Sequence, residues 1–207
     1  HKLSIVQNSK SILDHFKQLC ETGNTSLVLI SGNPGVGKSA LMKEVNERIV
    51  QSKGYFLTGK FDSNSRNIPL NAIIQAFTRF IRLILTETQE EIDDWKMILQ
   101  KALGANGKIV TDVIPDLELI IGKQPDIVQL GSQENANRFY LVFINFIKAF
   151  ANEEHPLVIF LDDCQWADNT SLELIKNVLG DDTATYIFPD LAYRDNEIGT
   201  NQTFFTE

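Results

Sequence analysis

The chain has 207 residues, of which 43% are hydrophobic and 22% charged, as in ordinary globular proteins. This length suffices for one α/β domain with a buried core and a helical insertion. No apolar run approaches the roughly 18 to 20 residues of a membrane helix, which counts against a membrane partner in this segment. The net charge of −8 and a pI near 4.9 would repel phosphate backbones and therefore count against nucleic acid as a partner.

The chain begins with His1 rather than Met, so we interpret it as a segment of a longer protein. Its two cysteines, Cys20 and Cys164, lie far apart in the sequence and do not form a CxxC pair. The cysteine pattern therefore predicts neither a zinc site nor a disulfide framework, and we expect reduced thiols and a cytoplasmic location.

Two strands and two helices are predicted in the first third of the chain. Apolar side chains recur at helical spacing over residues 9–21 and again over residues 40–50. The short, wholly apolar run at residues 27–30 is typical of a parallel strand that is covered on both faces. Residues 55–58 form the second predicted strand.

A glycine-rich turn connects the first strand to the second helix. Residues 32–39 fit G-x-x-x-x-G-K-[ST], the Walker A pattern, at every defined position. Glycines permit the tight turn and let backbone N–H groups approach a phosphate, and a helix that starts near Lys38 adds its positive end. The predicted phosphate-binding residues are Gly32, Asn33, Pro34, Gly35, Val36, Gly37, Lys38, Ser39 and Ala40.

The pattern also assigns separate roles to its last two residues. Lys38 would reach the β- and γ-phosphates and act in catalysis, and the Ser39 hydroxyl would bind Mg²⁺. The alternative is a chance glycine turn, against which stand the apolar strand before it and the amphipathic helix after it. The base-reading N-K-x-D loop of guanine-specific proteins and their D-x-x-G switch are both missing, so the expected nucleotide is ATP.

Residues 69–154 are expected to form a helical insertion between the second and third core strands. Within it, Thr88 and Glu91 have the spacing of a capping box for a helix that Gly104 ends. A short helix near residues 116–121 and a long one over residues 134–150 are also predicted. We treat residues 1–207 as a single domain that contains this insertion.

The third predicted strand, residues 157–161, is followed directly by two aspartates. Mg²⁺ bound at a P-loop needs an acidic group at the end of a neighbouring strand, and Asp162 is the candidate. Asp163 would polarise an attacking water as a general base. The alternative is a pair of surface aspartates that begin a loop.

The last part of the chain supplies one more helix and one more strand. Thr170 and Glu173 suggest the cap of a helix over residues 170–179. Residues 185–194 should form the fourth strand, but we expect Pro189 and Asp190 to interrupt it because proline removes a ladder hydrogen bond. The expected fold is a three-layer α/β sandwich with a mainly parallel sheet, strand order 1-4-3-2, and the phosphate site at the carboxyl end of the first strand.

Several runs across the chain resemble one family. They include residues 54–62, 66–69, 102–107, 112–115, 122–125, 137–139 and 155–168. Together they resemble the AAA-type ATPase domain of large bacterial multi-sensor signalling kinases, which is grouped with the STAND class of nucleotide-operated switches. In such kinases the domain lies between a serine/threonine kinase-like domain and sensor and histidine-kinase parts, so the resemblance implies that those domains are partners.

The resemblance also implies a sensor of the γ-phosphate at Arg194, at the end of the fourth strand. Its alternative is a surface arginine paired with Asp195 or Glu197. The expected function is Mg-ATP binding with slow hydrolysis as a signalling switch, and the alternative is an ATP-gated protein-interaction module without turnover. An origin-recognition-type ATPase is opposed by the acidic charge, and a small-molecule kinase by the absence of an acceptor-binding constellation.

Overall fold

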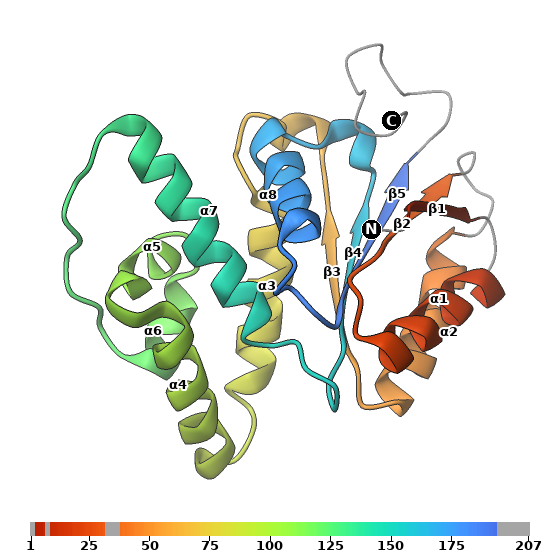
Figure 1. Ribbon diagram of the computed structural model, residues 1–207, viewed down its shortest axis with the longest axis horizontal. Coiled ribbons are helices and arrows are strands. Elements are labelled where there is room, and N and C mark those ends of the chain that lie inside the picture. The colour runs from red at the N-terminus through yellow and green to blue at the C-terminus, as the bar shows by residue number, and fades with distance from the viewer. Residues whose placement is uncertain (1–2, 7–8, 32–37, 194–207) are drawn as a thin grey trace. The chain divides into compact units, whose positions relative to one another are not determined.

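The computed structural model describes residues 3–6, 9–31 and 38–193 (Figure 1). The chain divides into two compact units, one made of His1–Ile73 with Ala151–Glu207 and the other of Ile74–Phe150. The first unit contains the sheet and the second is helical.

The first unit is built on a five-stranded parallel sheet. Its strands are β1 (Leu3–Val6), β2 (Leu27–Ser31), β3 (Tyr55–Lys60), β4 (Leu157–Asp162) and β5 (Ile187–Tyr193). Their order is β1-β2-β5-β4-β3, and every neighbouring pair is parallel. The predicted order 1-4-3-2 is confirmed for the four strands β2 to β5, whereas β1 is an additional edge strand that the sequence analysis did not predict.

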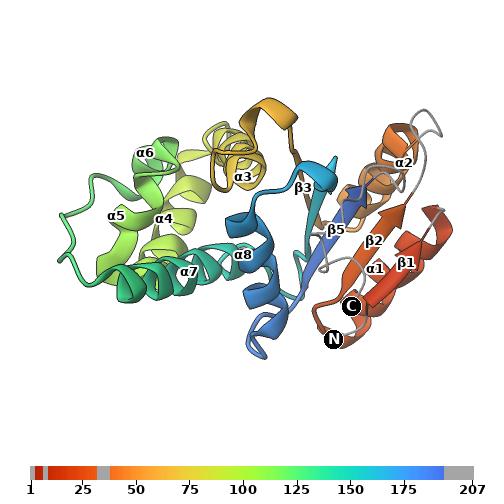
Figure 2. The same ribbon diagram turned by 90° about the horizontal axis from the view of Figure 1, so that it is seen from above.

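Helices cover both faces of this sheet, which confirms the three-layer α/β class. Figure 2 shows α1 (Ser9–Thr22) and α2 (Lys38–Gln51) on one face and α8 (Asn169–Gly180) on the other. The apolar stripes that predicted α1 and α2 are the faces that these helices bury. The core on this face consists of Ile12, Phe16, Leu19, Val28, Ile30, Met42, Val45, Ile49, Val158, Phe160, Phe188 and Ala192.

Strand β5 corrects the expectation that Pro189 would break the fourth strand. The strand runs without interruption from Ile187 to Tyr193 and pairs with β4 through Pro189 itself, which lies opposite Ile159. Its pairing with β2 begins only at Asp190, opposite Val28. The proline is tolerated because the ladder on the β2 side starts one residue after it.

The helix after β4 begins at a different cap from the expected pair Thr170 and Glu173. Asp168 is the N-cap of α8, and its side chain accepts a hydrogen bond from Ser171 N at 2.9 Å. Aspartate is among the best N-cap residues because its carboxylate satisfies an N–H that has no partner within the helix.

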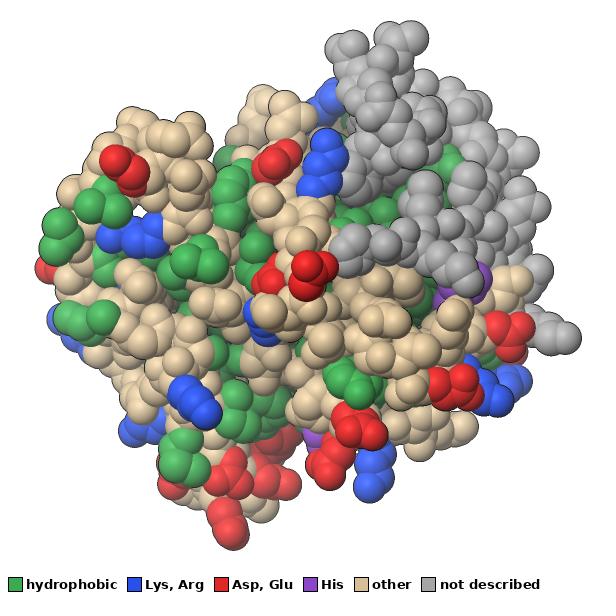
Figure 3. Space-filling view, in the orientation of Figure 1, with side chains coloured by type: hydrophobic (Ala, Val, Ile, Leu, Met, Phe, Trp, Pro, Cys, Tyr) green, Lys and Arg blue, Asp and Glu red, His purple; other side chains and the backbone are tan. Residues whose placement is uncertain are grey.

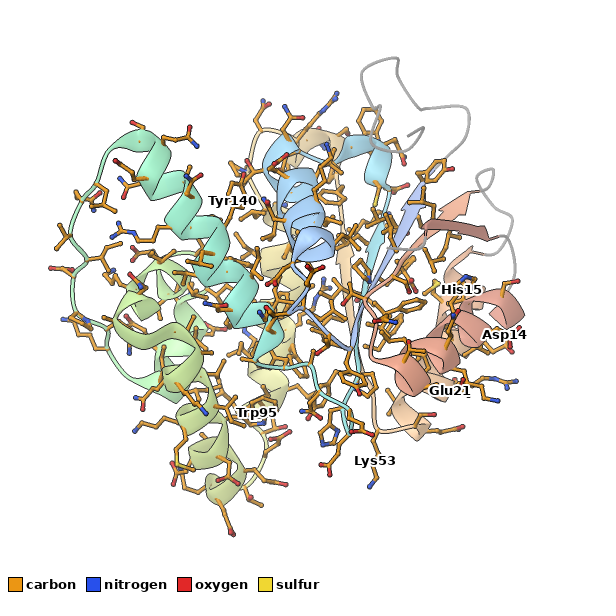
Figure 4. All side chains as sticks on the ribbon, in the orientation of Figure 1. Asp14, His15, Glu21, Lys53, Trp95 and Tyr140 are labelled. Atoms are coloured by element: carbon orange, nitrogen blue, oxygen red, sulfur yellow. The ribbon has the colours of Figure 1, made fainter. Side chains whose placement is uncertain are left out.

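The second unit contains the rest of α3 (Asn71–Ile84), α4 (Gln89–Leu103), α5 (Gly107–Thr111), α6 (Glu118–Ile121) and α7 (Ser132–Lys148). The predicted capping box is confirmed, since Thr88 and Glu91 exchange both hydrogen bonds at the start of α4. Aromatic rings fill the core of the unit, with ring centroids of neighbouring pairs 5.1 to 6.5 Å apart, among Phe77, Phe143, Phe146 and Phe150. Trp95, labelled in Figure 4, packs on Phe150.

The surface of the second unit carries scattered apolar side chains between its charged ones, as Figure 3 shows. Leu119 and Val128 are the most exposed of them. Across the described part of the chain, no helix combines the length and the apolar character that crossing a membrane requires.

Candidate functional site

The site is organised by the carboxyl ends of three parallel strands. Ser31 ends β2 and lies opposite Tyr193 of β5, while Leu161 near the end of β4 lies opposite Leu191. Because the strands are parallel and in this register, the segment after β2 and the segment after β4 leave the sheet at the same edge, with β5 between them.

The Walker A residues fall partly outside the described part of the chain. Gly32, Asn33, Pro34, Gly35, Val36 and Gly37 lie outside it, and so does Arg194. Lys38, Ser39 and Ala40 form the first turn of α2, so the helix starts where the sequence pattern predicts. The positive end of a helix dipole therefore lies directly after the predicted phosphate loop.

Asp162 and Asp163 stand at the end of β4, where their backbone changes direction. Asp162 is the last residue of the strand, and Asp163 has a φ of +53° in the left-handed region. Aspartate adopts this region more readily than most residues. The Asp162 Oδ1 atom accepts a hydrogen bond of 2.8 Å from Asp163 N, which stabilises the turn and orients the Asp162 carboxylate.

The Asp163 side chain is buried and bound on both of its oxygens. Only 7% of the residue is exposed. The Lys60 ammonium lies 3.3 Å from Oδ2, and the Gln165 amide donates to Oδ1 at 3.2 Å. A buried carboxylate needs such partners because an unpaired charge is strongly disfavoured away from water.

Lys60 reaches Asp163 because it ends the neighbouring strand. In the β3–β4 register Lys60 lies opposite Asp162, one residue before Asp163. Gly59 precedes it, and a Cβ there would lie 2.4 Å from the carbonyl oxygen of Ala72. Only glycine allows the chain after β3 to pass this close to the strand. The Lys60 side chain is 65% exposed, so the pair contributes at most about 1 kcal/mol to stability.

Asp168 connects the segments that follow β3 and β4. Its Oδ2 accepts hydrogen bonds from Leu70 N at 3.2 Å and from the Ser171 hydroxyl at 2.6 Å. Leu70 has a φ of +60° and is buried, so its backbone is held in an unusual conformation. This hydrogen bond therefore links the segment that follows β3 to the segment that follows β4.

Cys164 lies between the aspartates and Gln165 but is inert by its environment. Its thiol is fully buried and donates to Leu161 O at 3.1 Å. Burial raises the pKa of the Cys164 thiol well above its usual value, and the negative charge of Asp162 raises it further. A thiol with a raised pKa is a poor nucleophile and a poor metal ligand at neutral pH.

Asp162 has the chemistry of a ligand for a magnesium ion that is bound together with a phosphate. Among the described residues, no cluster of three or more His, Cys, Asp or Glu could hold a metal ion. Magnesium at nucleotide sites does not need such a cluster, since it keeps several waters and takes one or two protein oxygens. Asp162 offers a carboxylate of this kind at the carboxyl end of β4, where its Oδ1 accepts a hydrogen bond from Asp163 N.

Three residues in this arrangement were given no role in the sequence analysis: Lys60, Gln165 and Asp168. The strand order could have indicated Lys60, since a residue at the carboxyl end of the strand next to β4 must lie beside Asp162. The Gln165 contact with Asp163 depends on the short 3₁₀ turn Cys164–Trp166, which no periodicity predicts.

Several curated proteins are similar to this chain. Hybrid signal transduction histidine kinase G of Dictyostelium discoideum is 40% identical over 166 residues, which is 80% of this chain and 5% of that protein. Histidine protein kinase 1 of Candida albicans is 22% identical over 190 residues, which is 83% of this chain and 8% of that protein. Peroxide stress-activated histidine kinase mak2 of Schizosaccharomyces pombe is 23% identical over 172 residues, which is 74% of this chain and 7% of that protein.

The chain therefore spans less than a tenth of the length of the curated relatives it matches. The expected kinship with a domain of signalling kinases is confirmed, and the bacterial origin that the resemblance implied stays a prediction. Residues 9–188 match the AAA ATPase domain family. The parallel sheet order and the three layers agree with the P-loop NTPase fold expected of that family. The chain belongs to the AAA ATPase domain family.

Proposed function

We propose that this domain binds Mg-ATP and hydrolyses it slowly as a nucleotide-operated switch within a signalling kinase. Its family supports nucleotide binding, and its relatives are named as histidine kinases. The observation that carries the proposal is the pair Asp162 and Asp163 at the end of β4, on the sheet edge where β2 leads into the Walker A residues.

The proposed roles follow from position. Residues 32–40 cradle the phosphates, Lys38 neutralises their charge, and the Ser39 hydroxyl and Asp162 hold Mg²⁺. The metal supplies charge stabilisation to the phosphate oxygens. Asp163 accepts the proton of the attacking water, and Arg194 follows β5 where a γ-phosphate sensor would act.

Slow turnover follows from how Asp163 is held. A general base needs a free lone pair within hydrogen-bond reach of the water it activates. In this structure Lys60 and Gln165 occupy the carboxylate of Asp163 on both oxygens. A cation and an amide donor on the carboxylate lower its basicity, and this supports slow proton abstraction by Asp163.

The same contacts favour a second candidate function, an ATP-gated interaction module without turnover. If the Lys60–Asp163 pair persists when nucleotide is bound, Asp163 serves as a structural anchor of the site. Nucleotide binding would then order the domain and change the surface it presents to other domains of the parent kinase. The phosphotransfer activities in the relatives' names belong, on this proposal, to other regions of the parent protein.

Calorimetry with Mg-ATP and a phosphate-release assay on the same preparation test these proposals. The switch ATPase predicts binding that Lys38→Ala abolishes, with phosphate release that Asp163→Ala removes. Binding with no release above background would select the interaction module. No binding by the wild-type chain, with its fold intact by circular dichroism, would contradict both.

A further inference from the structure

Asp190 lies in the middle of β5 and is completely buried. Its register partners are Val28 on β2 and Phe160 on β4, so it occupies a central strand between two apolar neighbours. Side chains alternate along a strand, which puts Asp190 on the same face as Phe188 and Ala192, both members of the core under α1 and α2. Its exposed fraction is 0%.

Neither carboxyl oxygen of Asp190 has a hydrogen-bond partner within the described part of the chain. Buried polar groups are nearly always paired, and a buried carboxylate without a partner is far less stable than a neutral carboxylic acid. Burial raises the pKa of Asp190 well above its usual value.

The elements packed against this face offer little that could neutralise a charge there. On α1 the inward residues are apolar, and the half-buried titratable groups are the Cys20 thiol and His15, whose Nδ1 lies 2.6 Å from Ser11 O. Lys17 and Glu21 are exposed, and so is Asp14, which lies on the outer side of the helix in Figure 4. On α2 the described ionisable side chains Glu44, Glu47 and Arg48 are all exposed. Strand β2 carries no titratable residue.

Strand β4 contributes Asp162, which lies two positions beyond Phe160 on the same face. Its charge is negative and would oppose the ionisation of Asp190 rather than support it. Among the described residues, none donates a hydrogen bond to the Asp190 carboxyl.

We propose that Asp190 is held in its neutral form in the folded chain and that its ionisation opens β5, so that this residue favours the folded sheet unit in acid and opposes it as the pH rises. Strand β5 joins the strand before the Walker A residues to the strand that ends at Asp162. Opening β5 would separate the segment after β2 from the segment after β4. Protonation of Asp190 would therefore favour the state in which these two segments are held together.

The sign of the pH dependence follows from linkage. An aspartate in an unfolded chain has a pKa of about 3.9, whereas Asp190 in the folded chain keeps its proton to higher pH. Between those two points the folded state binds one more proton than the unfolded state. The folding equilibrium constant then falls by up to about tenfold per pH unit as the pH rises. The contribution of Asp190 to the stability of the fold is fully present in acid. It is lost as the pH rises through the pKa that Asp190 has in the folded chain.

Urea unfolding of the 207-residue chain between about pH 5 and about pH 8 tests the proposal, because this range lies above the unfolded titration. Asp190→Asn keeps the size of the side chain but cannot ionise. The wild-type folding constant should fall more steeply with pH than that of Asp190→Asn, by up to about tenfold per unit. Asp182→Asn, at an exposed aspartate, is the matched control and should keep the wild-type slope.

A second measurement observes the proton directly. The infrared carbonyl band of a neutral carboxylic acid should be present in wild-type protein at neutral pH and absent from Asp190→Asn. If Asp190→Asn does not fold, Asp190→Val replaces it in both measurements. Equal pH slopes in wild type and variant, or no such band in wild type, would overturn the proposal. Neither measurement uses nucleotide, so the outcome is independent of the proposed function.

Discussion

Asp163 and Asp190 are both buried aspartates in the same sheet unit, and their surroundings are opposite. Asp163 follows β4 at the carboxyl end of the strand, where Lys60 and Gln165 bind its two oxygens. Asp190 lies within β5 among apolar side chains and has no hydrogen-bond partner among the described residues. Burial alone does not distinguish them, since both are less than a tenth exposed.

The hydrogen-bond and ion-pair partners of a buried aspartate therefore indicate whether its charged or its neutral form is favoured. A cation and an amide beside a carboxylate favour its charged form, and the proposed function uses this carboxylate as the base of the nucleotide site. A carboxyl with no partner stays neutral and makes the fold itself depend on pH.

Asp163→Asn should have the largest effect, on turnover. The amide cannot accept the proton of water, so kcat for phosphate release should fall by about 10²- to 10⁴-fold. The Kd for Mg-ATP, measured by calorimetry, should change little, because the proposal assigns metal binding to Asp162. A variant that keeps the wild-type kcat would show that Asp163 is not the base.

Asp190→Val should stabilise the chain, which is unusual for a core substitution. An apolar β-branched side chain removes the unpaired carboxyl, and we expect a gain of about 3 kcal/mol in the free energy of unfolding at neutral pH. The gain should shrink as the pH is lowered, because the wild-type acid is then neutral in both states. Urea unfolding at two pH values measures it, and a loss of stability at both would contradict the description of Asp190.

Asp168→Ala tests an aspartate that is neither catalytic nor strained. It removes the N-cap of α8 and the acceptor for Leu70 N, and should cost about 1 to 2 kcal/mol of stability in thermal or urea unfolding. Asp182→Ala, at an exposed position in the same unit, should change stability by less than about 0.5 kcal/mol. Equal effects of the two substitutions would refute the fastening role of Asp168.

Lys60→Met should have the smallest effect on stability and a moderate one on rate. The exposed lysine contributes little to folding, so the free energy of unfolding should change by no more than about 1 kcal/mol. Release of Asp163 from the ammonium should raise basal phosphate release several-fold, while Lys60→Arg, which keeps the charge, should behave as wild type. A fall in turnover in Lys60→Met would mean that the pair positions Asp163 for catalysis.

Much of the sheet unit could be predicted from the sequence because the apolar runs that indicate strands are the same runs that occupy inner positions of the sheet. The apolar run before the Walker A pattern is β2, and the run before Asp162 is β4, with the register that the parallel topology requires. The four-residue β1 escaped prediction because so short a run shows no period, and its pairing with β2 alone makes it a strand.

The errors came from features decided by neighbours in space. Proline in β5 suggested a break, but whether a missing N–H matters depends on which side of the strand is paired at that residue. The contacts of Lys60 with Asp163 and of Asp168 with Leu70 join residues about a hundred positions apart. No local pattern contains that information. The roles of residues 32–40 and Arg194 stay predictions that binding experiments must test.

The most direct test of the central claim is calorimetric titration of the 207-residue chain with ATP in the presence of Mg²⁺, alongside Lys38→Ala. A nucleotide switch assembled on this sheet predicts saturable binding by the wild-type chain, its loss in Lys38→Ala, and its weakening when Mg²⁺ is removed. Equal binding by the wild type and the variant, or no binding by a folded wild-type chain, would contradict the account.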